Sequence, residues 1–233
     1  MKNDLSKVPI LYEDDELLVI NKPAGLLTVP DGYDPSLPHI RSVLEPAFNR
    51  LWIVHRLDKD TSGVIILAKN PDVHRQVNEL FSLRKVIKIY HGLVTPTPAW
   101  KTLDIQENLE VNADRMHRTR VKTSIGKPAR TLCRVLKSYN FGALMEIELF
   151  TGITHQIRAH LRTQNIALFG DKLYNAGLEE QPLFAVRTML HARSVSFSHP
   201  ITHKQIRITA PYPDDFRNFY NQLRTTKDLD TWI

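Results

Sequence analysis

One segment of the chain gathers side chains suited to acid–base chemistry. Residues 55–63 read HRLDKDTSG and lie between two apolar runs. Polar side chains in such a place are expected at a strand end or in a cleft, where functional residues concentrate. Asp58 and Asp60 could form a carboxylate pair that acts as nucleophile or general base. The alternative is a surface loop in which Arg56 pairs with Asp58, and residue types alone make the two interpretations equally good.

A second candidate is a basic segment. From Arg115 to Met145 the sequence has no Asp or Glu, although Lys and Arg recur throughout. Like charges repel unless an anion lies nearby, so such a run is typical of a phosphate-binding surface. Arg115, Arg118 and Arg120 are its first candidate phosphate contacts. The net charge of the chain is only +6, and a solvated basic face explains the charge alone equally well.

The composition argues against several other functions. Cys133 is the only cysteine, which excludes an internal disulfide and a thiolate metal cluster. His155 and His160 lack the i, i+4 spacing of a helical metal-binding pair, so we expect no metal site. The polar start of the chain lacks the apolar core of a signal peptide, and the strongest apolar run, 64–68, is too short to span a bilayer. We therefore expect a cytoplasmic protein without a membrane segment.

The elements that must position these residues are short strands with a few helices among them. The patterns predict strands at 10–12, 16–20, 64–68, 86–94, 131–135, 144–150, 193–198 and 205–210, helices at 39–48, 72–81, 155–162 and 214–223, and an irregular segment at 96–112. Such irregular interleaving favours a mixed α+β domain over a doubly wound one. We find no internal repeat or linker.

Residues 55–63 closely resemble the signature H-R-L-D-x-x-T-S-G of the RluA family of RNA pseudouridine synthases. Other family motifs follow in the family's order: NKPAG at 21–25, KIY at 88–90, GITHQIRAH at 152–160, GDKLY at 170–174 and LHA at 190–192. The resemblance covers about 10–211. It implies a pseudouridine synthase fold, with a largely antiparallel central sheet, flanking helices and a catalytic cleft. It also implies a single catalytic domain over 1–233, with a core at about 10–211 and a C-terminal helix at about 214–223.

The resemblance assigns a role to each motif residue. It implies that Asp58 is the catalytic carboxylate, that Tyr90 stacks on the flipped base and serves in proton transfer, and that Arg158 is the cation paired with Asp58 across the cleft. A permanent guanidinium charge would oppose the rise in pKa that burial of Asp58 causes. Arg56 resembles the arginine that helps to displace and replace the flipped base. Further substrate-binding residues are expected among the motif positions: His55, Thr61, Lys22, His155 and Gln156.

The implied reaction needs no cofactor, because uridine and pseudouridine are isomers. The implied partner is structured RNA, a stem-loop of ribosomal or transfer RNA or both, bound by a monomer. Two departures from the family concern RNA binding. Ile153 replaces a residue that is often basic, and the motifs begin too early for the N-terminal S4-like module of larger members. We therefore expect the catalytic domain itself to bind RNA, which favours a phosphate-binding role for the basic segment.

Two alternatives remain. The chain could be a non-catalytic RNA-binding or RNA-folding factor on the same fold, or a hydrolase that releases uracil. The presence of Asp58, Tyr90 and Arg158 argues against the non-catalytic factor, and release of free uracil would distinguish the hydrolase. Whether Asp58 attacks the sugar, attacks the base or removes a sugar proton is left open.

Overall fold

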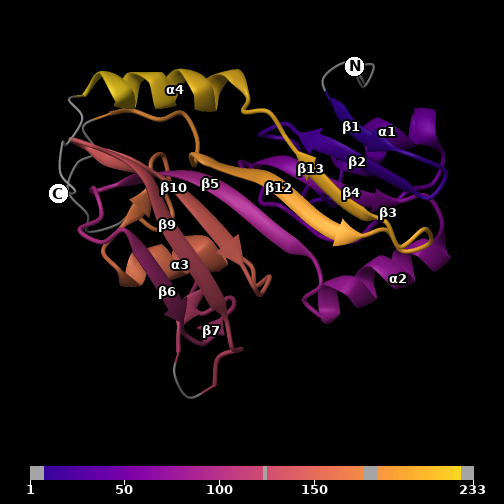
Figure 1. Cartoon of the computed structure of the whole chain (residues 1–233), viewed down its shortest axis with the longest axis horizontal. Coiled ribbons are helices and arrows are strands. Elements are labelled where there is room, and N and C mark those ends of the chain that lie inside the picture. The colour runs from indigo at the N-terminus through magenta and orange to yellow at the C-terminus, as the bar shows by residue number, and fades with distance from the viewer. Residues whose placement is uncertain (1–7, 123–124, 176–182, 227–233) are drawn as a thin grey trace. The chain divides into compact units, whose positions relative to one another are not determined.

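The computed structural model describes residues 8–122, 125–175 and 183–226 (Figure 1). The chain divides into two compact units. Unit 1 comprises Met1–Lys88 and Ala192–Tyr212, and unit 2 comprises Ile89–His191 and Pro213–Ile233. The boundaries fall within two strands, β5 (Ile87–Thr95) and β12 (Leu190–Ser198). Each unit has its own sheet segment and its own helices.

Unit 1 is built on strands β1 (Ile10–Glu13), β2 (Leu17–Lys22), β4 (Ser62–Ala68) and β12, in that order. The short β3 (Trp52–Ile53) pairs with β4, and β13 (Gln205–Thr209) pairs with β12. Every residue of β2 and β4 is buried, which explains why these strands have nearly continuous apolar sequences. Helices α1 (Ile40–Phe48) and α2 (Pro71–Ser82) complete the unit.

The core of unit 1 forms where α2 packs on the central strands. Val73 and Val77 of α2 join Val64 and Ile66 of β4 in one apolar cluster. Helix α2 begins at Pro71, whose preceding residue Asn70 accepts a hydrogen bond from the Val73 amide at 2.9 Å. This arrangement is a normal helix start, because proline at the first position loses no intrahelical bond. The result is a rigid frame directly after the segment that carries Asp58.

Gly63, the second residue of β4, lies at a place where another side chain has no room. Its φ is +117°, and an added Cβ would lie 2.2 Å from the carbonyl oxygen of Ala192 in β12. Contacts this short are impossible for a real Cβ, so the backbones of these two strands approach closely only because residue 63 is glycine.

Unit 2 has the strand order β5, β10 (Gly142–Leu149), β9 (Arg130–Tyr139) and β6 (Thr102–Gln106), and β11 (Ala167–Leu168) pairs with β5. A second, small sheet joins β7 (Leu109–Glu110) to β8 (Arg120–Val121). Helix α3 (Gln156–Thr163) packs near β9 and β8, and α4 (Asp214–Thr225) ends the described chain (Figure 1). The long hairpin of β9 and β10 forms the centre of this sheet.

The expected α+β fold with a largely antiparallel sheet is confirmed. The expected irregular segment at 96–112 is wrong in part, because it contains β6 and β7. Strand β6 pairs with β9 at the sheet edge and turns only Leu103 and Ile105 inward, which leaves a weak apolar alternation. Within the described residues, no helix is long and apolar enough to cross a membrane.

Candidate active site

The backbone around Asp58 is held on both sides. Asp58 lies in the loop between β3 and β4, and its side chain is half-buried. On one side, the Thr28 hydroxyl accepts from the Leu57 amide at 3.1 Å and donates to the Leu57 carbonyl at 2.8 Å. On the other, the Thr61 amide donates to the Asp58 carbonyl at 3.1 Å. These bonds fix where the Cα of Asp58 lies within unit 1.

Lys22 holds a neighbouring loop onto the same segment. Its side chain is fully buried, and its ammonium donates to the carbonyl oxygens of Lys59 at 3.0 Å, Leu26 at 2.7 Å and Pro23 at 2.9 Å. A buried ammonium is tolerated only when its donors are satisfied in this way. The expected contact of Lys22 with RNA is therefore corrected to a structural role, because the charged group faces the interior.

Thr61 and Arg56 differ sharply in exposure. Thr61 is 3% exposed, so its expected contact with substrate would need the loop to open. Arg56 is exposed, which leaves its guanidinium accessible to a nucleic acid.

His55 faces the protein interior as a neutral ring. Its Nε2 accepts a hydrogen bond from the Ile66 amide at 3.0 Å, and its ring stacks on Phe81 with centroids 4.9 Å apart. Burial, assisted by the charge of Lys88, lowers the pKa of His55 to about 3. With Nε2 as acceptor, the ring proton lies on Nδ1. His55 thus ties the segment to β4 and α2, while its expected contact with substrate stays a prediction because the residue is half-buried.

Two of the expected catalytic residues lie in unit 2. Tyr90 is in β5 opposite Ile147 of β10, and it is 9% exposed. Arg158 is in α3 and forms a two-pronged ion pair with Asp171, with Nε–Oδ2 and Nη2–Oδ1 both at 2.7 Å. This geometry fixes the plane of the guanidinium. The sequence offered Asp171 only as a member of the GDKLY motif, and we did not predict its pairing with Arg158.

His155 precedes α3 in a left-handed conformation, with φ +56°. Its ring meets the Tyr174 ring edge-on at 5.7 Å, and its Nδ1 lies 3.2 Å from the Tyr174 hydroxyl. The ring of Tyr174 is in turn covered by the guanidinium of Arg158, 4.8 Å from its centroid. His155 is half-buried, so part of its ring remains open to a substrate.

Gln156 uses its amide to fix the loop before α3. It is 2% exposed. Its Oε1 accepts from the Thr151 hydroxyl at 2.8 Å and the Ile153 amide at 3.1 Å, while its Nε2 donates to the Arg130 carbonyl at 3.0 Å and the Thr131 hydroxyl at 2.9 Å. These bonds saturate the amide, because it offers two donors and one carbonyl oxygen. The expected substrate contact of Gln156 is therefore corrected to a positioning role.

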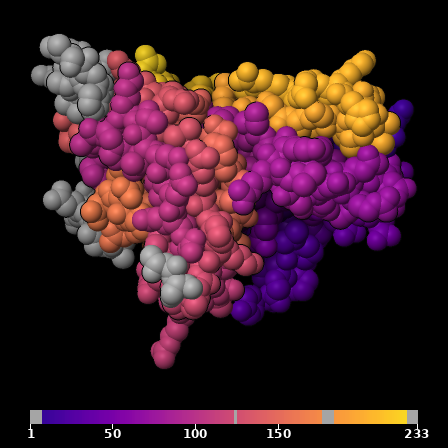
Figure 2. All heavy atoms as spheres, turned by 60° about the horizontal axis from the view of Figure 1, so that its bottom comes forward, coloured from indigo at the N-terminus to yellow at the C-terminus, as the bar shows by residue number. Residues whose placement is uncertain are grey.

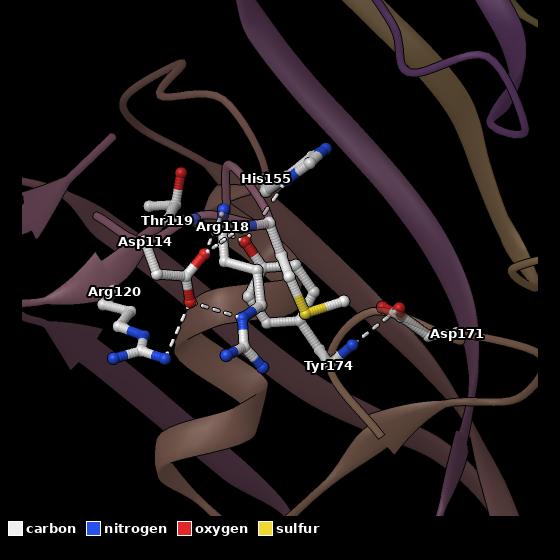
Figure 3. A network of polar contacts seen from close by, with 8 residues as sticks. Asp114, Arg118, Thr119, Arg120, His155, Asp171 and Tyr174 are labelled. Carbon is white, nitrogen blue, oxygen red and sulfur yellow. Dashed lines mark hydrogen bonds and ion pairs between the residues drawn. The ribbon is translucent and has the colours of Figure 1, made fainter. Parts of the chain in front are cut away.

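The basic segment is neutralised in part by carboxylates from outside it. Asp114 lies between Arg118 and Arg120, with its Oδ2 at 2.7 Å from Arg118 Nε and 2.7 Å from Arg120 Nη2 (Figure 3). Three further pairs are Lys122–Glu110, Arg130–Asp104 and Arg134–Glu146. The absence of acidic residues within the run therefore does not by itself require RNA. Arg115 is exposed.

In the space-filling view, the pink atoms of this part of the chain lie at the surface of unit 2, and side chains project from it into solvent (Figure 2). Several of its paired arginines also keep substantial exposure, such as Arg120 at 53%. The segment thus remains open to an external anion even though much of its charge is balanced.

The described residues include no group of three His, Cys, Asp or Glu side chains arranged to hold a metal ion. The two histidines considered earlier have other partners. His160 is fully buried, with Nδ1 2.9 Å from the Thr131 hydroxyl and Nε2 3.3 Å from the Glu107 carbonyl.

Comparisons with known proteins agree with the motifs. The family model described as RNA pseudouridylate synthase matches residues 16–163. Ribosomal large subunit pseudouridine synthase D of Xanthomonas campestris pv. campestris is 34% identical, over 92% of this chain and 69% of the relative. The synthase D of Neisseria meningitidis serogroup A is 33% identical, over 95% of this chain and 63% of the relative. Ribosomal large subunit pseudouridine synthase C of Escherichia coli O157:H7 is 34% identical, over 94% of this chain and 70% of the relative. The chain thus spans between 63% and 70% of the length of these relatives.

Among solved structures, human RNA Pseudouridylate Synthase Domain Containing 4 matches with a TM-score of 0.78 and 27% identity, over 93% of each chain. Human RNA Pseudouridylate Synthase Domain Containing 1 matches with a TM-score of 0.76 and 22% identity, over 97% of this chain and 98% of that chain. The second likeness concerns the fold alone.

Proposed function

Because the chain belongs to the RNA pseudouridylate synthase family, we propose that it isomerises selected uridines of ribosomal RNA to pseudouridine with Asp58 as the catalytic carboxylate. The observation that carries this proposal is the HRLDKDTSG segment, with Asp58 on a loop whose backbone is held on both sides. The names of the relatives, ribosomal large subunit pseudouridine synthases D and C, support ribosomal RNA as the substrate. These names do not mention transfer RNA. A ribosomal RNA substrate also accords with the expected cytoplasmic location.

The reaction sets clear demands on the protein. The N1–C1′ bond of the uridine breaks, the uracil turns over, C5 bonds to C1′, and the hydrogen of C5 leaves as a proton while N1 gains one. Asp58 must be ionised when the substrate binds, whether it serves as nucleophile or as base. Its backbone hydrogen bonds remove the freedom that the loop would otherwise have, so the backbone that carries the carboxylate is in place before the RNA arrives.

The partner residues have complementary tasks. We assign to Arg158 the permanent positive charge of the site, and its ion pair with Asp171 holds the guanidinium in one orientation. We assign to Tyr90 the aromatic surface on which the uracil stays during rotation, since stacking of a base on an aromatic ring contributes about 1–3 kcal/mol. We assign to the exposed Arg56 the role of filling the space that the flipped uridine leaves in the RNA. Flipping a base out of its stack costs a few kcal/mol.

Release of tritium from RNA labelled at C5 of uridine tests this function directly. The wild-type chain is expected to release tritium and to leave pseudouridine in the RNA. A hydrolase would instead produce free uracil, which chromatography separates. A chain that binds RNA without releasing tritium from ribosomal RNA transcripts would be the non-catalytic factor, and the proposal would be wrong.

A further inference from the structure

Unit 2 contains a pocket that the residues assigned to catalysis do not line. Its volume is about 570 Å³, and its walls include Arg118 and Arg120 of the basic segment together with Ala159, Arg162 and Tyr174. Asp58, Tyr90 and Arg158 are not among the residues that form its walls. This volume falls within the range of about 300–1,000 Å³ that is usual for small-ligand sites. It exceeds what a single small anion needs.

The local structure explains why three arginines line this pocket. Ala159 and Arg162 are three residues apart on α3, so both project from one face of the helix. The short Ala159 side chain leaves space that a larger one would fill. Arg118 and Arg120 are two residues apart in an extended stretch, so they project to the same side. Asp114 holds both of them (Figure 3).

The carboxylates described near the pocket are already bonded to other groups. Asp114 is shared by two guanidinium groups and also accepts from the amides of Met116 at 3.0 Å and Arg118 at 3.2 Å. At the rim, Glu107 accepts from the Thr163 hydroxyl at 3.0 Å. Among the described residues, the walls of the pocket include three arginines and no Asp or Glu. The lining of the pocket is therefore positively charged.

The chemistry of these groups selects a phosphate. Planar guanidinium forks match the oxygens of a phosphate better than they match a neutral ligand. Base recognition by stacking is not available from Tyr174, because its ring is 5% exposed and is covered by Arg158. The pocket is thus suited to the backbone of a nucleic acid and not to a base.

We propose that this pocket binds one phosphodiester group, with its ribose, of the RNA strand that carries the target uridine. Asp114 is the positioning residue that orients Arg118 and Arg120, and Arg162 of α3 supplies the third guanidinium. The inference rests on the proposed RNA substrate and adds a binding site to it. Because the contacts are to phosphate, the pocket strengthens binding of all RNA sequences about equally.

The salt dependence of RNA binding tests the proposal. A phosphate contact contributes about 0.7–0.9 to the slope of log K against log salt. Arg162→Gln is therefore expected to lower the slope by about that amount, and Arg120→Gln likewise. The matched control is Arg217→Gln, which removes an equally exposed arginine of unit 2 (59% against 53%) that pairs with Asp214 in α4. The control is expected to keep the wild-type slope, and Arg162→Lys is expected to keep it too because the charge remains.

An unchanged slope in Arg162→Gln and Arg120→Gln would overturn the proposal, as would an equal loss in Arg217→Gln. Melting temperatures of all variants confirm that each one is folded.

Titration with inorganic phosphate distinguishes a site for free phosphate from a site for the phosphate of an RNA backbone. Tight phosphate binding that Arg162→Gln abolishes, together with an unchanged RNA slope, would show a site for a free anion and would overturn the RNA assignment. Tritium release by the wild-type chain is measured in parallel. Release with unchanged slopes leaves the isomerase standing without this pocket, and no release contradicts the isomerase itself.

Discussion

The loop around Asp58 and the basic segment near Asp114 use charged side chains in opposite ways. At the loop, inward-facing polar groups bond to backbone atoms, as Lys22 of the neighbouring strand β2 and His55 of the loop itself do. In the basic segment, charged groups face outward and pair with other side chains, as Arg120 does with Asp114. Buried bonds to the backbone fix geometry and are insensitive to salt, whereas exposed ion pairs contribute little to stability and exchange readily for other anions.

This comparison predicts that changes in the loop will affect catalysis or stability, whereas changes in the basic segment will affect the salt dependence of RNA binding. Four sets of variants test the contrast.

The largest effect is expected for Asp58→Asn. Turnover should be abolished while RNA affinity changes by less than about tenfold, or roughly 1.4 kcal/mol, because phosphate contacts dominate binding. Tritium release from C5-labelled RNA measures the first quantity and filter binding the second. Asp60→Asn, two residues along the same loop, is the matched control and is expected to remain active. Appreciable tritium release by Asp58→Asn would refute the assignment.

Lys22→Met is expected to destabilise unit 1. It leaves buried carbonyl oxygens without a donor, at a cost of about 1–3 kcal/mol. For a chain of this size, each kcal/mol lowers the melting temperature by roughly 2–4 °C. The salt slope of RNA binding should be unchanged, because the ammonium is buried. A normal melting temperature with a shallower slope would instead return Lys22 to the RNA-binding residues.

The pKa of His55 predicts a dependence of stability on pH. The folded pKa of about 3 lies below the ordinary 6.5, so the unfolded chain binds the proton more tightly. The contribution of the neutral ring is therefore complete above pH 6.5 and declines as the pH falls toward 3, by about 2 kcal/mol at pH 5. His55→Gln removes this titration and can still accept from the Ile66 amide. Urea unfolding at pH 7.5 and pH 5 is expected to show a smaller acid-induced loss in His55→Gln than in the wild type, and equal losses would contradict the buried neutral ring.

The smallest effect on stability is expected for the double change Arg118→Gln with Arg120→Gln. Exposed ion pairs contribute about 0.2–1 kcal/mol, so the melting temperature should barely move. The slope of log K against log salt should fall by about 1.4–1.8, from two lost phosphate contacts. Site choice should not change, because phosphate contacts carry no sequence information. An unaltered slope would identify this part of the segment as an ordinary solvated face.

The difference between the regions also explains what the sequence could reveal. Strands β2 and β4 were predictable because they are buried on both faces and therefore have nearly continuous apolar sequences. Strand β6 was not, because an edge strand with two inward residues resembles an irregular polar segment. Asp58 could be found because the motif around it is distinctive.

The roles of Lys22 and Gln156 could not be found in this way. A motif gives residue types but does not say whether a polar side chain faces solvent or the interior. The acceptors of Lys22 include the Lys59 carbonyl, and a backbone carbonyl leaves no signal in the sequence.

The close approach of β4 and β12 at Gly63 bears on how an inactive descendant of this chain could be recognised. Gly63 is required by the Ala192 carbonyl beside it, and Lys22 by the carbonyls around its ammonium. Loss of activity would relax neither requirement, because both belong to folding. A descendant that had lost its chemistry could therefore change Asp58 while retaining the glycine and lysine of its motifs. Among these three positions, only the identity of residue 58 would then distinguish an active enzyme from an inactive descendant that still folds.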